Sequence, residues 1–440
     1  MPGWSLQTIV TIQWWGVSLT LPAYSACGIY GPKRHARRYA ERVRLPWFSL
    51  LLLSAGIFVA VTSEFLPIGL LPQLTDDLGI TEAQVGMLIT VFAASVVIAT
   101  APLTHLTRAV PRKTLLVALL AVFSVANLLA ALAPGYAVLL VGRILGGAAH
   151  GVFWAVVTPY AARLVPPHRL ASAVAVASAG ATVATVAGVP LGTLLGSVVG
   201  WRASFAVIAG LVIAVAVLIA AVLPLVEHQA PIGLTDAAEP ARALLRAVRD
   251  ITIAPVIMLC VIVVLVTLGH ATFYTYIAAW VIDVAGFGVA EVPAVLLVFG
   301  AAGTVGVVIV GVVGDRYPRA LLPVLLSGVI VSVTGVGLLS QAPFAVIVLL
   351  VLWSAFLGGV PIIFQARLLQ TASLAVRDIA AAWLVVAFNV GIGGGALFGG
   401  MVIEGWSVAA LPVVTVSFLF AALVLLSTVG ALARRQRALA

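Results

Sequence analysis

The chain has 440 residues, of which 63% are hydrophobic and only 8% are charged, and its mean hydropathy is +1.23. Soluble domains are about half apolar and about a quarter charged, so this composition excludes a soluble enzyme, a nucleic-acid-binding protein and a disordered chain. The apolar runs are long and continuous, which indicates helices that cross a membrane and excludes a β-barrel. The meaning of the net charge of +9 therefore depends on where the basic residues lie.

Residues 1–46 precede the predicted membrane spans. Residues 7–29 are moderately apolar, contain Gln7 and Gln13, and follow no basic residues, so they do not resemble a signal peptide. We expect residues 1–46 to be a cytoplasmic N-terminal extension, or an artefact of a start codon placed too early. A thirteenth membrane span over 7–29 is the alternative.

Twelve apolar runs follow, each about 20 residues long, which is the length that crosses the hydrocarbon core of a bilayer. They predict an all-α integral membrane protein with two pseudo-symmetric six-helix bundles, residues 47–226 and 251–431, a cytoplasmic linker, 227–250, and a basic cytoplasmic tail, 432–440. The predicted spans are 47–71, 86–106, 114–134, 136–158, 171–196, 203–226, 253–277, 292–313, 320–340, 344–365, 379–402 and 408–431.

The basic residues set the predicted topology. If the first span runs outward, the seven cytoplasmic segments hold 21 of the 23 lysines and arginines. Arg202 falls in an outer loop and Arg143 falls within a span. Because positive charge is retained on the cytoplasmic side, we expect a multi-pass protein of the plasma or inner membrane with both termini in the cytoplasm.

The two halves resemble each other. The string Ala-Arg-Leu at 162–164 recurs at 366–368, and the glycines at 188, 192 and 196 recur at 391, 395 and 399. A parallel repeat of six helices is typical of one large class of secondary transporters, with the substrate site between the halves. Between them, Arg242, Arg246 and Arg249 share one helical face, so the linker is either a short helix at the membrane surface or a solvated connection.

Ionisable residues inside the membrane are costly, so each is a candidate functional residue. Glu64 and Arg143 lie at similar depths, about 12 Å below the outer boundary of their spans at 1.5 Å per residue. An acid that gains and loses a proton as its cationic partner moves could couple transport to protons. The alternative is a structural ion pair that joins the first span to the fourth.

Three further polar residues lie within spans. His270 follows Glu64 by 206 residues, close to the repeat offset, so we expect it at the equivalent place in the seventh span. His150 lies near the middle of the fourth span, and Asn389 lies in the eleventh. Each could line a substrate cavity or relay a proton, and each could equally be a neutral hydrogen-bonded group between helices.

The fifth span carries a stripe of small residues. Small residues four apart let helices approach closely, and a proline frees a backbone carbonyl and permits a bend. The eleventh span, with GIGGGALFGG at 391–400, repeats the pattern, and paired flexible seams suit rocking of one half against the other. The residues of the fifth-span stripe are Gly180, Gly188, Pro190, Gly192 and Gly196.

Enzyme and metal motifs are not found. The sequence has no phosphate-binding loop, zinc-ligand cluster or nucleophile elbow, and Cys27 and Cys260 lie in different kinds of segment. We expect neither an enzyme nor an ATP-driven pump, no metal and no cofactor, with a proton gradient as the energy source.

These residues resemble the major facilitator superfamily, and within it the twelve-span drug:proton antiporters of the arabinose-efflux-permease-like group, over residues 47–431. The first span reads TSEFLPIGLLPQLTDDLGI, the fourth GRILGGAAHGVFWAV and the fifth GVPLGTLLGSVVGWRASF, similar to that group's opening, proton-coupling and antiporter motifs. The antiporter motif departs by one residue, because its Gly-Pro is Gly188-Val189-Pro190 here.

The resemblance also implies a cytoplasmic conformational latch. The loop after the second span, THLTRAVPRKTLL, looks like a degenerate gating loop that keeps Arg112 but lacks the usual aspartate. Its second-half copy, GVVGDRYPRA, keeps Asp315, Arg316 and Arg319. In the family such an aspartate is held against a neighbouring helix end.

The expected function is proton-coupled export of a small organic solute, such as a drug, sugar or nucleoside, by alternating access. The resemblance implies Glu64 as the titrating acid and Arg143 as its modulator. A uniporter or importer of sugars or nucleosides is the alternative, and a non-transporting membrane receptor is a third reading. We expect a monomer in the lipid bilayer, with protons and a small solute as partners and no nucleic acid.

Overall fold

The structure is a computed structural model that describes residues 9–14, 17–22, 46–166, 169–224, 250, 252–314, 316–317, 320–373 and 376–439. It divides into two compact units, Met1–Leu45 and Pro46–Ala440. In the first unit, β1 (Ile9–Trp14) pairs with β2 (Val17–Pro22) in an antiparallel hairpin. The described part of the stretch 7–29 is therefore β-strand, which contradicts the alternative of a thirteenth spanning helix there.

The second unit is helical, and among its described residues twelve helical segments are long and apolar enough to cross a membrane, as predicted. The first half consists of α2 (Trp47–Gly69), α3 (Leu71–Leu78), α4 (Glu82–Leu106), α5 (Arg112–Ala131), α6 (Tyr136–Arg163), α7 (Leu170–Val183), the π-helical turn η2 (Ala184–Gly188), α8 (Val189–Val199) and α9 (Trp201–Val222). The second half consists of α11 (Ile253–Tyr274), α12 (Ile277–Asp283), α13 (Val292–Val313), α14 (Leu321–Leu338), α15 (Pro343–Gly358), α16 (Val360–Thr371), α17 (Arg377–Gly405) and α18 (Leu411–Leu439), with short 3₁₀ turns at Val289–Glu291 and Val408–Ala410.

Two predicted segments flank the spans of the second half. Most of the predicted basic tail, 432–440, continues α18, which ends at Leu439, and its cytoplasmic location stays a prediction. Most of the predicted linker, including its three arginines, lies outside the described residues, and only its last residue, Asp250, is described. The carboxylate of Asp250 accepts hydrogen bonds from the hydroxyls of Thr252 and Ser373, both at 2.6 Å. The start of α11 is thereby tied to the turn that follows α16.

The glycine stripe of the fifth span packs against α2 in constant register. An alanine Cβ at Gly180, Gly188, Gly192 or Gly196 would lie 2.0–2.5 Å from an atom of a residue 126 positions earlier, so each glycine is required for this close approach. The π-helical turn η2 ends at Gly188, two residues before Pro190. Since a proline has no N–H to give to the preceding turn, the helix widens there without breaking.

The second half repeats this packing. Gly188 lies against the hydroxyl of Thr62, and Gly391 lies against the hydroxyl of Thr267. The two glycines are separated by 203 residues and the two threonines by 205, which agrees with the offset of the predicted repeat. The first and fifth spans of each half therefore meet through equivalent residues.

Gly180→Ala is expected to lower the free energy of unfolding by about 1–3 kcal/mol. Its Cβ would lie 2.0 Å from the main-chain oxygen of Ser54, an obstacle that cannot rotate away. The matched control is Gly210→Ala in α9, where a Cβ meets nothing within 4 Å and helix propensity favours alanine. Denaturant unfolding in detergent micelles measures both, and equal midpoints for the two variants would contradict the packing.

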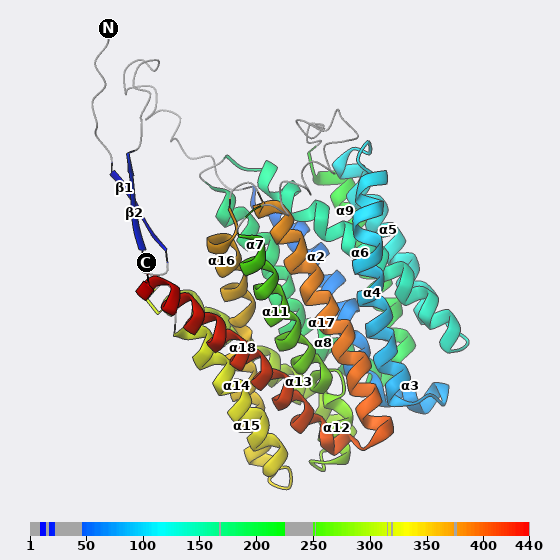
Figure 1. Cartoon of the computed structure of the whole chain (residues 1–440). Helices are drawn as coiled ribbons and strands as arrows, with labels where there is room; N and C mark the ends of the chain where they lie inside the picture. Colours follow the sequence, from blue (N-terminus) through cyan, green and yellow to red (C-terminus); the bar gives the residue numbers. More distant parts are fainter. Residues whose placement is uncertain are drawn as a thin grey trace. The chain divides into compact units, whose positions relative to one another are not determined.

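The halves meet along α4 and α17, which run side by side through the bundle (Figure 1). Thr90 donates its hydroxyl hydrogen to the main-chain oxygen of Gly393 at 2.9 Å. The same seam brings Ala83 against Gly400 and Ala93 against Gly393. The antiparallel pairs 83–400 and 90–393 are one heptad apart, so one continuous face of each helix makes the contact.

One end of the bundle is held by a clamp that joins α3, the start of α9 and the loop after α5. The indole N–H of Trp201 donates to the carboxylate of Asp77 at 3.1 Å, and Arg202 donates both to that carboxylate and, at 3.1 Å, to the main-chain oxygen of Ala133. These three segments therefore lie together, and α12 contacts α3 at the same end. We call it the α3 end.

The clamp gives a pH-dependent prediction. Hydrogen bonds from Arg202 and then Trp201 hold the pKa of the Asp77 carboxyl below its usual range. A carboxyl with a lowered pKa stabilises the folded state above its unfolded pKa and loses that contribution as the pH falls through the folded value. Asp77→Asn should therefore lower the melting temperature by about 1–2 °C at pH 7, because exposed ion pairs contribute little.

The difference between Asp77→Asn and the parent chain should shrink as the pH falls below about 4. Thermal melts of both proteins in detergent, recorded at neutral and acidic pH, measure it. A difference that grows on acidification would contradict this role of the carboxylate.

Candidate functional site

The site begins in the middle of α2, where an apolar helix carries three consecutive buried polar residues, Thr62, Ser63 and Glu64. Glu64 is 7% exposed. Its carboxylate oxygen Oε2 lies 3.4 Å from Nε2 of His150 on α6. The first and fourth spans are thus joined at this depth by an acid and an imidazole.

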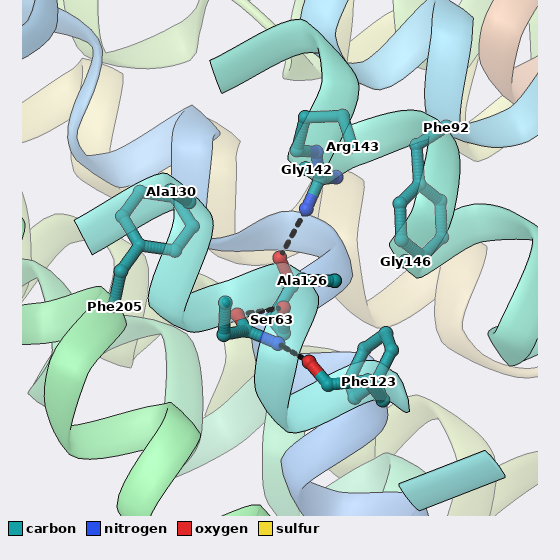
Figure 2. Close-up of a pocket in the computed structure, with 10 residues that line it drawn as sticks. Ser63, Phe92, Phe123, Ala126, Ala130, Gly142, Arg143, Gly146 and Phe205 are labelled. Carbon is teal, nitrogen blue, oxygen red and sulfur yellow. Dashed lines mark hydrogen bonds between the residues drawn. The ribbon is translucent and has the colours of Figure 1, made fainter. Parts of the chain in front are cut away.

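Arg143, one of the two residues expected to form the proton-coupling pair, lies on α6 and is 3% exposed. Its guanidinium donates to the main-chain oxygens of Ser63 at 2.9 Å and Glu64 at 2.7 Å, and Figure 2 shows it directed at Ser63. A weaker bond at 3.3 Å reaches the main-chain oxygen of Leu88 on α4. Arg143 therefore links three spans of the first half.

The reason these carbonyls are available lies in Pro67. A proline has no N–H, so the main-chain oxygen four residues earlier, that of Ser63, loses its helical partner. A buried carbonyl without a donor destabilises a structure, and in a membrane water cannot replace the donor. The planar guanidinium of Arg143 fills that role and bridges to the next carbonyl.

The expected ion pair thus takes a different form. Arg143 hydrogen-bonds the main chain of Glu64, while the carboxyl group of Glu64 is directed to His150. The guanidinium also lies 4.2 Å from the centre of the Phe92 ring, which completes its surroundings. Its charge acts on the carboxyl group through space, so Glu64 and Arg143 lie together but not through the expected atoms, and their role in proton coupling stays a prediction.

His150 is surrounded by aromatic rings. The indole N–H of Trp154 donates to its Nε2 at 2.8 Å, and the Phe92 and Phe123 ring centroids lie 5.2 and 6.1 Å away. An Nε2 that accepts from an indole carries a lone pair, so the imidazole is in the neutral Nδ1–H form. The carboxyl group of Glu64 can donate a proton to the same lone pair, and Trp154 competes with it for that position.

A polar chain beside the site was missed by the sequence analysis. The hydroxyl of Ser63 donates to Oδ1 of Asn127 on α5 at 2.6 Å, and the Asn127 amide donates to the main-chain oxygen of Phe123 at 2.8 Å. These residues line a cavity of about 10 Å³ with Arg143 and Phe205, which is room for the centre of about one water molecule (Figure 2). The available signal was a lone amide in an apolar span.

The two candidate cavity residues of the second half, His270 and Asn389, make contacts within their own half. The His270 ring stacks on Tyr274 with centroids 4.9 Å apart and meets Trp353 of α15 edge-on at 5.5 Å. It faces the fourth span of its half, as Glu64 faces α6 in the first, so its place agrees with the predicted equivalence. Asn389 donates its amide back to the main-chain oxygen of Val385 at 3.0 Å. These contacts do not test roles for His270 or Asn389.

The predicted latch is described only in part. Asp315 and Arg319 lie outside the described residues. The Arg316 guanidinium carbon lies 5.8 Å from the centre of the Tyr317 ring. Arg112 starts α5 and lines a cavity of about 70 Å³ with Tyr160 and Arg163. The latch therefore stays a prediction.

Metal coordination has no support among the residues that the structure describes, where no group of three His, Cys, Asp or Glu side chains gathers. The expectation that transport uses a proton gradient and no cofactor is not tested by this observation.

Comparisons with known proteins agree with the fold. The sequence model of the Major Facilitator Superfamily matches residues 53–377. A bacterial homologue of the human lysosomal transporter Spinster, in an inward-facing and unoccupied conformation, has a TM-score of 0.66 and 17% identity, covering 88% of this chain and 96% of that one. The human organic anion transporter MFSD10 (TETRAN) has a TM-score of 0.67 and 14% identity, covering 87% of this chain and 100% of that one. At these identities the solved structures show the fold alone.

Proposed function

This chain belongs to the major facilitator superfamily of multi-pass membrane transporters, and from that premise we propose that it exports a small organic solute in exchange for protons by alternating access. The single observation that carries the proton coupling is the contact between Glu64 and His150 inside the membrane-spanning part of the first half. Both groups can take up and release a proton, and a charge at this depth is costly without a partner.

Coupling follows from how the two spans hold the proton. While α2 and α6 stay together, the Glu64 carboxyl group and His150 Nε2 lie 3.4 Å apart, close enough for a proton on Glu64 to be held between the two groups. A movement that separates them, or that brings water to them, changes which protonation state is favoured. Arg143 fixes the main chain of Glu64 during this change.

The proposed direction of transport follows from the fifth span. The fifth-span stripe resembles the antiporter motif that the family associates with export, and the structure gives these glycines a packing role against α2. A uniporter or importer of sugars or nucleosides is the alternative. Few ionisable groups face the described interior, which favours neutral or weakly polar solutes over multiply charged ones.

The proposed topology follows the distribution of basic residues. With both termini in the cytoplasm, the α3 end lies outside, and Arg202 lies there in its clamp with Asp77. The α4–α17 seam then closes the outer side. The proposed location is the plasma or inner membrane, and the proposed oligomeric state is a monomer. The proposed conformational latch on the cytoplasmic side consists of Asp315, Arg316 and Arg319.

The test uses inside-out vesicles with an imposed acidic lumen. Phenicols, sugars, nucleosides and lipophilic cations are added in turn, and a pH-sensitive dye reports the lumen. Alkalinisation by one class of compound, absent from vesicles without the protein, is the expected result. Radiolabelled solute that equilibrates without moving protons would contradict antiport and support the uniporter.

A further inference from the structure

The seventh span is interrupted between α11 and α12, and Tyr276 occupies the interruption. Its N–H donates to the main-chain oxygen of Phe273 at 3.0 Å, a tight turn that ends α11, and Trp280 donates to its main-chain oxygen to begin α12. The side chain is 0% exposed. A large side chain placed at a helix break is free to project away from the helix axis.

The Tyr276 side chain lies between α17 of its own half and α4 of the other half. Its hydroxyl donates to the main-chain oxygen of Ala396 on α17 at 2.6 Å. Three glycines surround it, and we call them the glycine socket: Gly86 of α4, and Gly399 and Gly400 of α17.

The socket leaves no room for larger residues. An alanine Cβ at Gly86 would lie 1.7 Å from the Tyr276 hydroxyl oxygen, and one at Gly399 would lie 2.6 Å from a ring carbon. Such distances are far below van der Waals contact, so the phenol fits only because these positions lack side chains. At Gly86, the tyrosine hydroxyl of one half occupies the space on α4 of the other half that a side chain would fill.

The glycine socket lies where the two halves of the protein meet. It lies on the α4–α17 seam, between the Ala83–Gly400 contact and the Thr90–Gly393 hydrogen bond, toward the α3 end. Opening of the α3 end requires α4 to move away from α17, because the seam joins the two halves. The contact between Tyr276 and Gly86 must break in that movement.

We infer that Tyr276 is the seal of the α3 end: seated in the glycine socket it holds the two halves together, and it leaves Gly86 when that end opens. The inference rests on the alternating access proposed above, but it requires neither proton coupling nor a known solute. Tyr276 acts as a positioning residue, because it sets the population of the closed state and contacts no transported group.

The test measures how readily the seam opens. Ala93 faces Gly393 in the seam and is 1% exposed, so a cysteine there is protected while the seam is closed. The reporter protein carries Ala93→Cys, with Cys27 and Cys260 replaced by serine. A membrane-impermeant methanethiosulfonate reagent is applied to right-side-out and to inside-out vesicles, without solute and without a pH gradient, and the labelling rate is measured from each side.

Tyr276→Phe keeps the ring and removes one buried hydrogen bond, so labelling from the α3 side should become about two- to tenfold faster. Gly86→Ala should accelerate labelling at least as much, because its Cβ displaces the hydroxyl. In a protein that already carries Tyr276→Phe, Gly86→Ala should add less than it does alone, since both changes act on one contact.

Two matched control variants distinguish loss of the Tyr276–Gly86 contact from a general loss of helix packing. Tyr136→Phe removes a similar hydroxyl-to-carbonyl bond, 2.8 Å to Gln84, that lies within one half. Gly394→Ala adds a methyl group on α17 whose nearest neighbour, at 3.6 Å, is in ordinary contact. Both should leave the labelling rate unchanged.

Unchanged labelling in both Tyr276→Phe and Gly86→Ala would overturn the inference. So would equal acceleration in the controls, or acceleration seen only from the side opposite the α3 end. Because labelling needs no solute, these outcomes are distinct from failure of the proposed proton-coupled export, which would show only in the vesicle assay.

Discussion

Glu64→Gln is expected to reduce proton-coupled transport to the level of protein-free vesicles. Glutamine keeps the size and shape of the side chain but cannot bind or release a proton between pH 5 and 9 or so. Its amide can donate a hydrogen bond toward Nε2 of His150, which lies 3.4 Å from the carboxyl oxygen, so the contact that joins α2 to α6 can be kept. The variant therefore imitates one protonation state permanently.

Exchange of solute for solute should survive this substitution. Exchange needs the halves to move with solute bound, and it needs no change in protonation if the protonated form can return loaded. The expected pattern is therefore loss of the lumen pH response together with retained counterflow of labelled solute. The measurement compares the two assays in the same vesicles.

The matched control is Glu291→Gln. Glu291 lies in the exposed turn before α13, where its carboxylate accepts the Gly288 N–H at 2.7 Å. The substitution removes the same charge from the exposed first turn of the span Val289–Val313, away from Glu64 and His150, so coupled transport should persist. Normal pH-driven transport by Glu64→Gln would contradict the assignment of Glu64 as the proton-binding acid. Loss of coupled transport in both Glu64→Gln and Glu291→Gln would indicate a general effect of removing a charge.

Much of the fold could be predicted because hydropathy identifies the membrane spans and the positions of the basic residues indicate their orientation. All twelve spans are found, since each must satisfy its main chain within a helix of about 20 apolar residues. The repeat was also visible, because close helix packing requires glycine at fixed positions in both halves. The strands at Ile9–Trp14 and Val17–Pro22 were not predicted, because a short moderately apolar segment fits a strand and a helix about equally well.

The candidate site was predicted by residue but not by contact. Depth along a helix identified Glu64 and Arg143, yet depth does not say which atoms of a neighbour are free to bind. That information lies in Pro67, which leaves the main-chain oxygen of Ser63 without its helical donor. The contact of Asn127 with Ser63 was missed because it depends on how the third span is rotated, and an almost uniformly apolar helix gives no such signal.

Arg143 should respond to substitution differently from Glu64. Arg143→Met keeps a long apolar side chain but leaves the main-chain oxygen of Ser63 without a donor inside the membrane. We expect loss of both coupled transport and solute exchange, because the main chain of α2 just before Pro67 is no longer held against α6. Retained exchange in this variant would contradict a role in fixing the main chain.

Arg143→Lys tests the geometry of the guanidinium. Lysine keeps the positive charge, but an ammonium is a point donor and does not match the parallel bonds to Ser63 and Glu64 at 2.9 and 2.7 Å. If charge alone tuned Glu64, Arg143→Lys would keep coupled transport. If the two parallel hydrogen bonds of the guanidinium hold α2 against α6, Arg143→Lys should lose most of both coupled transport and solute exchange. Arg169→Lys, at an exposed position before α7, is the control that should behave as the parent chain.

The two substitutions together separate two tasks that one motif combines. Glu64→Gln should lose coupling and keep exchange, whereas Arg143→Lys should lose both, since one residue binds the proton and the other holds the helix that carries it. The same pattern of loss in both variants would mean that the carboxyl group and the guanidinium act as one unit through their charges. In that case the attraction between the two charges would position Arg143, and its hydrogen bonds to the main chain would follow from that position.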